Sequence, residues 1–280
     1  MKHLFIIIIS LILAVPQSLF GQSKGYSTPE EAMKAEILKN LADYVSRSGL
    51  KDDGLNKAID IFMKQNQPEI VFANSMELSN AGFAIGDYGL GWCYEGGEGI
   101  AFDQNKAFKF FQKAATADIP FDLAFRSLGY HYFNGDGVEK DLTQAYKWFS
   151  KGADCITIDQ YRSDCLRCMA NMLLNGEGVN PNEEEAFKLY CESAQLFPQP
   201  RAAFMAGMMK LQGIGTEKNQ EQALIWIEKA AQLGHPDAQF IYGVFLIHEV
   251  GNITEGEKWV MNAAINGNTD AMMYIQQKEQ

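Results

Sequence analysis

Apolar residues recur along much of the chain with the spacing of an amphipathic α-helix. Ala107 is followed by large apolar residues three and four positions later, and by a small residue after seven positions. This spacing places the apolar side chains on one face of a helix, whereas a strand would alternate them. The same pattern begins again at Ala145, Ala186 and Ala223. The pattern therefore predicts four amphipathic helices in succession.

These helices belong to a longer repeat. Four segments align without gaps: LGWCYEGGEGI from Leu90, LGYHYFNGDGV from Leu128, MANMLLNGEGV from Met169 and AGMMKLQGIGT from Ala206. Successive units lie 38, 41 and 37 residues apart, which predicts a repeat architecture. Each unit contains a helix A, a Gly-x-Gly turn and a helix B. An Asp or Asn, a good N-cap residue, stands in front of each helix B: Asp103, Asp141, Asn182 and Asn219.

The units resemble Sel1-like repeats, which are relatives of the tetratricopeptide repeat. GDYGLGWCYEGGEGI with DQNKAFKFFQKAA, and RSLGYHYFNGDGV with DLTQAYKWFSKGA, are close to the family pattern over whole units. The resemblance covers residues 81–280 and implies an all-α fold, a right-handed α-solenoid of helix-turn-helix repeats. We expect about five units, the fifth with a turn three residues shorter, and a C-terminal capping half unit from Gly267 to Ala271. Residues 22–80 are predicted to form an N-terminal helical cap and one degenerate repeat.

The beginning of the chain predicts export. A short basic start precedes a nearly uninterrupted apolar run from Leu4 to Val15, which Pro16 ends. This is the layout of a signal peptide, and the run is shorter than the about 20 residues of a membrane-spanning helix. We predict a signal peptide over residues 1–21, no stable membrane insertion after its removal, and a periplasmic or extracellular mature protein. An uncleaved membrane anchor is the alternative.

Composition and charge exclude several classes of protein. The chain of 280 residues is 47% hydrophobic, near the globular average, which excludes collagen-like, low-complexity and fully disordered proteins. Its net charge of -11 argues against non-specific nucleic-acid binding, because phosphate contacts need clustered Lys and Arg.

Motifs for catalysis or cofactor binding are not found in the sequence. The Gly-x-Gly pairs follow a helix and lack a following Lys-Ser/Thr, so their glycines are predicted to supply positive φ in a turn instead of holding phosphate. The Ser48-Gly49-Leu50-Lys51 segment matches Ser-x-x-Lys, but the companion motifs of serine β-lactamases are missing. Neither His-Glu-x-x-His nor paired Cys-x-x-Cys blocks occur. We predict no catalytic residues, no metal and no cofactor.

The cysteines are disulfide candidates. Four of the five lie close together in the sequence, at Cys155, Cys165, Cys168 and Cys191, and Cys93 stands apart. In an oxidising compartment such cysteines form disulfides more often than metal sites. We predict Cys155–Cys165 across a long return between units and Cys168–Cys191 between antiparallel helices, with Cys93 free. The two other pairings of the four, and buried free thiols, are the alternatives.

Candidate partner-binding residues follow from the resemblance. In this family helix A lines the concave face, which suggests a groove near Tyr88, Trp92, Arg126, Tyr130, His131 and Arg167. Aromatic residues at helical spacing are usually core residues, so burial is the alternative for Trp92 and Tyr130. The tryptophans that recur at one position of helix B are predicted to be core: Trp148, Trp226 and Trp259.

The resemblance implies a non-enzymatic scaffold or adaptor that binds a protein or peptide on an extended concave surface. An enzymatic alternative exists because some cysteine-rich Sel1-like proteins carry a penicillin-binding or β-lactamase label. A third possibility is recognition of a cell-wall glycan or peptide, for which exposed Trp92 and Tyr130 would be the discriminating feature.

Overall fold

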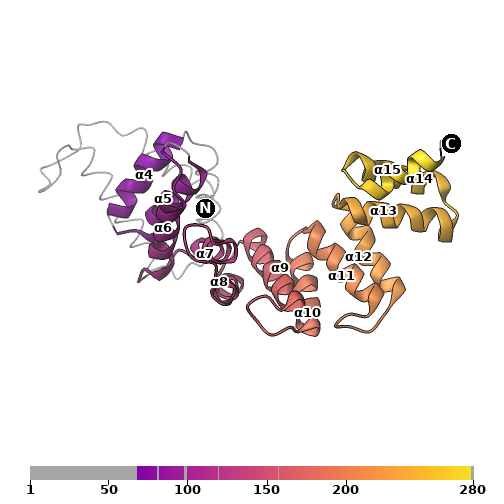
Figure 1. Ribbon diagram of the computed structural model, residues 1–280, viewed down its shortest axis with the longest axis horizontal. Helices are drawn as coiled ribbons and strands as arrows, with labels where there is room; N and C mark the ends of the chain where they lie inside the picture. The colour runs from indigo at the N-terminus through magenta and orange to yellow at the C-terminus, as the bar shows by residue number, and fades with distance from the viewer. Residues whose placement is uncertain (1–67, 81, 98–99, 119, 157, 279–280) are drawn as a thin grey trace, which may run out of the picture.

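The protein is a row of antiparallel helix pairs. In the computed structural model these pairs succeed one another along the long axis, from α4 at one end to α15 at the other (Figure 1). No strand occurs among the described residues, which are 68–80, 82–97, 100–118, 120–156 and 158–278. The predicted signal peptide and the part of the N-terminal cap up to residue 67 lie outside these ranges.

Helices A and B alternate along the chain. The first helix is α4, Pro68–Asn80. Helices A are α5 (Ala84–Gly96), α7 (Leu123–Asn134), α9 (Asp159–Asn175), α11 (Pro200–Gln212) and α13 (Pro236–Phe245). Helices B are α6 (Gln104–Thr116), α8 (Leu142–Cys155), α10 (Glu183–Leu196), α12 (Gln220–Gln232) and α14 (Ile253–Ile265), and α15 spans Thr269–Lys278. The prediction of an all-α solenoid is confirmed.

The predicted N-caps begin the helices B. The side chain of Asp103 accepts a hydrogen bond of 3.0 Å from the backbone N–H of Lys106. This bond satisfies one of the N–H groups that the first turn of a helix leaves open. The same bond, to the residue three positions on, is made by Asp141, Asn182, Asn219 and Asn252.

Within a unit, a glycine on helix A allows helix B to approach closely. A Cβ atom added at Gly91 would lie 2.7 Å from the ring of Phe111, and one at Gly129 would lie 2.5 Å from the ring of Phe149. Both distances are well below ordinary van der Waals contact, and both rings are fully buried. Glycine is therefore needed at these positions. The same relation joins Gly207 to Ile227 and Gly243 to Val260.

The tryptophans of helix B lie at the margin of the core, which corrects their predicted burial. Each is half-buried, and the fully buried residue is the next one along the helix, which faces the glycine of helix A. Because one residue turns an α-helix by about 100°, the tryptophan is rotated away from that contact. Trp148 stacks instead on Phe125 of α7, with ring centroids 5.8 Å apart.

The second glycine of the Gly-x-Gly turn forms the contact between units. Gly137 has a φ of 68°, and a Cβ added there would overlap the backbone carbonyl of Gln104 at the start of α6. Positive φ and the lack of space both exclude a side chain. Gly178 and Gly215, with φ of 70° and 64°, meet the starts of α8 and α10 in the same way. The prediction that these glycines serve the turn is confirmed.

The fifth unit has a different turn. Helix α13 continues into a π-helical segment, Leu246–Val250, and Gly251 ends it with a φ of 75°. The turn is three residues shorter than in the preceding unit. A single glycine of positive φ therefore stands where each of the three preceding units has two.

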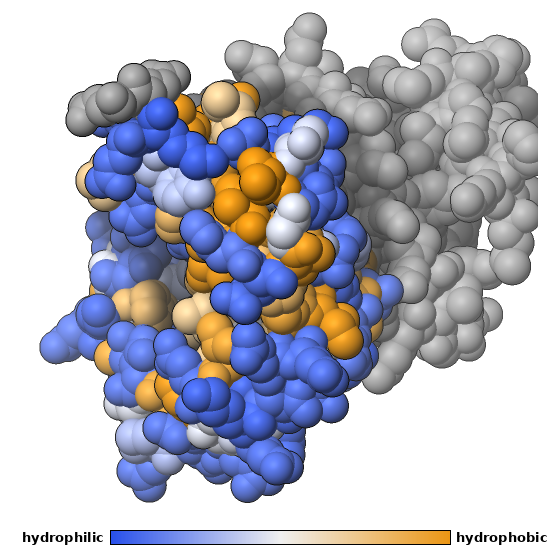
Figure 2. All heavy atoms as spheres, turned by 90° about the vertical axis from the view of Figure 1, so that its right-hand side faces the viewer, coloured by the Kyte–Doolittle hydropathy of each residue, from blue (hydrophilic) through white to orange (hydrophobic). Residues whose placement is uncertain are grey.

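The C-terminal end of the solenoid exposes apolar side chains. Figure 2 views this end and shows apolar residues gathered along its middle, with polar residues around them. Ile265 is 75% exposed. A capping repeat usually carries a polar outer face, whereas this end combines polar residues with an apolar patch. The other exposed apolar residues of α14 and α15 are Ile253, Met261, Met272 and Met273.

Among the helices that the structure describes, none combines the length and apolar character needed to cross a membrane.

Gly137→Ala should lower the free energy of unfolding by about 2–5 kcal/mol, because positive φ is strained for alanine and the new Cβ displaces the backbone of α6. The matched control is Gly234→Ala, which has a φ of 89° and no atom within 4 Å of an added Cβ. It should cost only about 1 kcal/mol. Urea unfolding followed by circular dichroism measures both losses. Equal losses would contradict the role of Gly137 in the contact between units.

Candidate functional site

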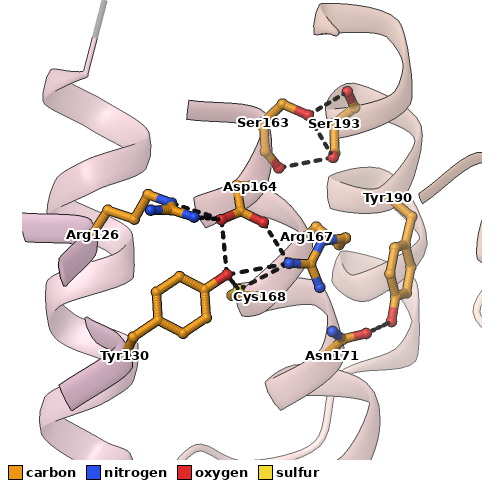
Figure 3. A network of polar contacts seen from close by, with 9 residues as sticks. All are labelled: Arg126, Tyr130, Ser163, Asp164, Arg167, Cys168, Asn171, Tyr190 and Ser193. Carbon is orange, nitrogen blue, oxygen red and sulfur yellow. Dashed lines mark hydrogen bonds and ion pairs between the residues drawn. The ribbon is translucent and has the colours of Figure 1, made fainter. Parts of the chain in front are cut away.

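A polar network joins helices α7 and α9 (Figure 3). Its centre is Asp164 of α9, which is 9% exposed. The Oδ2 atom accepts hydrogen bonds from Arg126 Nε at 2.7 Å and from Tyr130 Oη at 2.8 Å, both from α7. The Oδ1 atom pairs with Arg167, one turn further along α9. One carboxylate therefore links the helices A of two neighbouring units.

The two arginines determine the charge of this network. Burial raises the pKa of Asp164, but the positive charges of Arg126 and Arg167 outweigh it and hold the pKa below the ordinary value. Burial lowers the pKa of Arg126, and the carboxylate of Asp164 more than restores it. All three groups are thus ionised at neutral pH, and two guanidinium groups against one carboxylate leave an excess of positive charge.

Tyr130 and Cys168 extend the network. Tyr130 Oη lies 3.2 Å from Cys168 Sγ and 3.2 Å from Arg167 Nη2. Burial raises the pKa of the phenol and of the thiol, so both are protonated at neutral pH. The guanidinium of Arg126 also lies over the ring of Tyr130, 4.9 Å from its centroid, which is a cation–π contact. Tyr130 is therefore held from two sides.

None of the five cysteines is disulfide-bonded in this structure, so neither predicted disulfide is formed. Cys155 is exposed at the end of α8, whereas Cys165 is buried on α9, where its sulfur packs against Gly152. Cys168 lies in the network. Burial raises the pKa of Cys191 to about 11 and moves that of Cys165 in the same direction. The alternative of buried free thiols describes Cys165 and Cys168.

The structure brings three of the six predicted partner-binding residues together: Arg126, Tyr130 and Arg167. Tyr88 is half-buried on α5, and its ring centroid lies 5.5 Å from that of Phe111. Trp92 is also half-buried on α5 and packs against the apolar core.

His131 is buried, which corrects the prediction that it lines a groove. It is 1% exposed, and its Nδ1 atom is hydrogen-bonded to the backbone carbonyl of Asp136 in the following turn. The Nε2 atom lies 3.5 Å from a carboxylate oxygen of Glu95. Burial lowers the pKa of His131, but Glu95 and the carbonyl of Asp136 raise it above the ordinary value. The position two residues after the glycine faces inward, so His131 supports the turn.

A hollow of about 260 Å³ lies beside the network, between α9, α11 and the start of α13. The imidazole of His235 stacks on the ring of Phe204, with centroids 4.3 Å apart and planes 19° from parallel. We call this hollow the α9–α11 pocket. It is lined by Arg167, Asn171, Tyr190, Arg201, Phe204, Met205, His235 and Asp237.

Several polar groups of the α9–α11 pocket have unused hydrogen-bonding capacity. Tyr190 donates to Asn171 Oδ1, which leaves the amide N–H groups of Asn171 for another partner. Burial raises the pKa of Tyr190 to about 12, which keeps this donor protonated. The Nδ1 atom of His235 is buried without a hydrogen-bond partner among the described residues. Arg201 is exposed.

The repeat itself contains a signal for these residues. The position three residues before the helix-A glycine or alanine holds the predicted Arg126 and Arg167. The position six residues before it holds Asp164, Arg201 and Asp237 in successive units. Both positions lie on one helical face. Aligning the helices A on this register could therefore have found Asp164 and Arg201.

Asp164→Asn should lower the free energy of unfolding at pH 7 by about 2–4 kcal/mol, because it leaves two partly buried arginines without their carboxylate. The folded pKa of Asp164 is lowered, so its contribution is present above about pH 4 and is lost as the pH falls through that lowered value. The difference between wild type and variant should therefore shrink below about pH 4. Urea unfolding at several pH values measures it, with the exposed Asp118→Asn as control. A difference that is unchanged at low pH would refute the role of the ionised carboxylate.

The comparison with family models gives a direct match. The model described as Sel1 repeat matches four segments, residues 84–118, 126–155, 166–196 and 200–235. Each segment corresponds to one helix pair, from α5–α6 to α11–α12.

Similar proteins include one curated relative and two solved structures. The exopolysaccharide production negative regulator of Rhizobium meliloti (strain 1021) is 30% identical over 121 residues, which are 37% of this chain and 45% of the relative. The chain thus spans less than half of that relative. The Sel1 repeat protein from Oxalobacter formigenes is 28% identical, with a TM-score of 0.60 over 72% of this chain and 86% of that chain.

A protective antigen of uropathogenic Escherichia coli strains that displays an SLR fold has a TM-score of 0.65. The match covers 89% of this chain and 58% of the antigen. Because the two sequences are only 22% identical, this likeness supports the fold alone. The matched repeats, the glycine register and the paired helices agree, and they show that this chain belongs to the Sel1 repeat family.

Proposed function

We propose that this protein is an exported, non-enzymatic scaffold that binds a protein or peptide on the surface formed by its helices A. Sel1 repeats typically mediate protein–protein interaction. The observation that carries the proposal is the set of polar side chains on α7, α9 and α11, where Arg167 belongs both to the Asp164 network and to the lining of the α9–α11 pocket.

The chemistry of this surface suits recognition of a polypeptide. Arginine and tyrosine are enriched among the residues that dominate binding energies at protein interfaces. Arg126 and Tyr130, four residues apart on α7, project from one helical face, as do Arg167 and Asn171 on α9. Phe204 of α11 adds a half-buried aromatic surface beside them. This surface therefore combines guanidinium groups with apolar contact area.

Rigidity supports the same function. Gly129 and Gly207 allow α7 and α11 to pack closely against their helices B, and the network holds α7 to α9. Binding to a rigid surface costs less conformational entropy than binding to a surface that must first become ordered. The nucleophilic groups of this surface, the thiol of Cys168 and the phenol of Tyr130, are kept protonated by their raised pKa values. The non-enzymatic part of the proposal is drawn from this chemistry.

Export is a separate part of the proposal. It is supported by residues 1–21, in which an apolar run from Leu4 to Val15 follows a basic start. An exported scaffold would meet its partner in the periplasm or outside the cell.

A photo-crosslinking residue, p-benzoylphenylalanine, should capture a partner when it replaces Met205, which lines the pocket, in cells that make the protein. The control position is Glu221, which is exposed on α12, a helix B. One protein, identified by mass spectrometry, should be crosslinked from position 205 and lost when an excess of uncrosslinked chain is added. Equal crosslinking from position 221, or none from position 205, would contradict binding on the surface of helices A.

Residues 1–21 fused to alkaline phosphatase without its own signal should give periplasmic enzyme activity, because this phosphatase is active only after export. Ile8→Asp in the same fusion should abolish activity by placing a charge in the apolar run. Activity in cell fractions measures the outcome. A fusion that stays inactive, with its protein present in the cytoplasm, would refute export.

A further inference from the structure

We infer that the α9–α11 pocket binds a carboxylate group of the partner polypeptide, held between Arg167 and Arg201. This inference rests on the proposed function, because it names the chemical group by which a bound polypeptide would be recognised.

The neighbouring interface shows a carboxylate in the equivalent place. Between α7 and α9, Arg126 binds Asp164. Arg126 stands three residues before Gly129, and Asp164 stands six residues before Ala170, the equivalent position of the next unit. The Oδ2 atom of Asp164 lies 2.7 Å from Nε and 2.6 Å from Nη2 of Arg126, so one guanidinium contacts the carboxylate with two nitrogens. The chain thus builds one complete arginine–carboxylate site at this register.

One unit further along, the carboxylate is replaced by a cation. Arg167 occupies the position of Arg126, and Arg201 occupies the position of Asp164. Both arginines line the α9–α11 pocket. The two interfaces therefore share the arginine on the first helix A and differ in the group that the next helix A presents to it.

Arg201 forms no ion pair within the part of the chain that the structure describes. Asp237 also lines the pocket, but its Oδ1 atom accepts a hydrogen bond of 2.7 Å from Asn268. Asp164 is already shared between Arg126 and Arg167. Three guanidinium groups thus face two carboxylates, in a chain whose net charge is -11.

The remaining lining of the pocket also fits a carboxylate. Such a group accepts hydrogen bonds only, and the amide N–H groups of Asn171 can donate them. The Nδ1 atom of His235 also lacks a partner among the described residues, but it is buried beneath the pocket surface. Burial and the nearby charge of Arg201 lower the pKa of His235, so this ring is neutral and can carry its proton on Nδ1. Phe204 and Met205 offer apolar surface to the atoms that carry the carboxylate.

The volume of the pocket limits the size of the group that it can bind. A volume of about 260 Å³ lies below the roughly 300–1,000 Å³ of small-molecule sites, and it suits one side chain or one chain end. Two sources of carboxylate meet this description, the side chain of Asp or Glu and the C-terminal carboxylate of the partner. Both present the same group to Arg201, so an experiment must separate them.

Peptide pools of known carboxylate content test the inference. The chain from residue 22 is immobilised, and three octapeptide pools of otherwise random composition are passed over it. The first contains one fixed Glu and an amidated C-terminus, the second replaces Glu by Gln and has a free C-terminus, and the third has Gln and an amidated C-terminus. Asp and Glu are left out of all random positions, and the retained peptides are quantified by mass spectrometry.

At least one carboxylate pool should be retained about tenfold more than the pool without carboxylate, which corresponds to about 1.4 kcal/mol of binding free energy. The pool that is retained identifies the source. Arg201→Gln should reduce this retention about tenfold, and Arg201→Lys should restore part of it. Lys109→Gln, which removes the same charge from an exposed position on α6, should change nothing. Circular dichroism confirms that each variant is folded.

The outcomes separate this inference from the proposed function. Equal retention of all three pools, or retention that survives Arg201→Gln, would overturn the carboxylate site and leave binding on helices A intact. Retention of no pool would also overturn the carboxylate site, and crosslinking from position 205 would then decide whether a partner binds the surface in another way. Failure of both experiments would overturn both conclusions.

Discussion

The close approach of backbones at glycine is the contact on which the rest of this structure depends. Gly137, Gly178 and Gly215 touch the start of the preceding helix B, where a single Cβ would overlap a backbone carbonyl group. The three units that begin with α7, α9 and α11 therefore pack on their predecessors with little freedom to slide. Because the units stack in this fixed way, the helices A keep a constant register, and residues three and six positions before the helix-A glycine become neighbours across units.

The polar network is a consequence of that register. Arg126 and Asp164 are 38 residues apart in the chain, yet they meet because one unit separates them. Removing two charged groups from water is costly, and it is compensated only when hydrogen bonds satisfy the charges. Asp164 meets this condition with Arg126, Tyr130 and Arg167. In a solenoid each unit contacts only its neighbours, so the network specifies the orientation of α7 against α9 more than it adds stability.

The same register relates the network to the proposed function. At one interface the chain provides both the cation and the carboxylate, and at the next it provides arginines from both sides. A repeat architecture makes such a comparison meaningful, since equivalent positions have equivalent surroundings. The difference between the two interfaces is then a difference in side-chain chemistry on the same scaffold, and it locates the place where a partner would supply the missing group.

The helices, their caps and their turns could be predicted from the sequence because they depend on residues a few positions apart. The helices follow from the apolar spacing, the caps from Asp103 and its equivalents, and the turns from glycines that adopt positive φ. The predicted signal peptide is equally local, although it lies outside the described residues. The repeat could be recognised for the same reason, since each unit carries all of these signals.

Tertiary packing decided the features that depend on how helices are rotated and stacked. Trp148 and Phe149 are adjacent and both aromatic, and only the packing of helix B against Gly129 shows that Phe149 is the buried one. His131 and Tyr130 are also adjacent, but one supports a turn and the other faces Asp164. The sequence by itself determined the helices and their turns through short-range interactions. Which side chains share a site was decided by the stacking of units, because that stacking brings together residues nearly 40 positions apart.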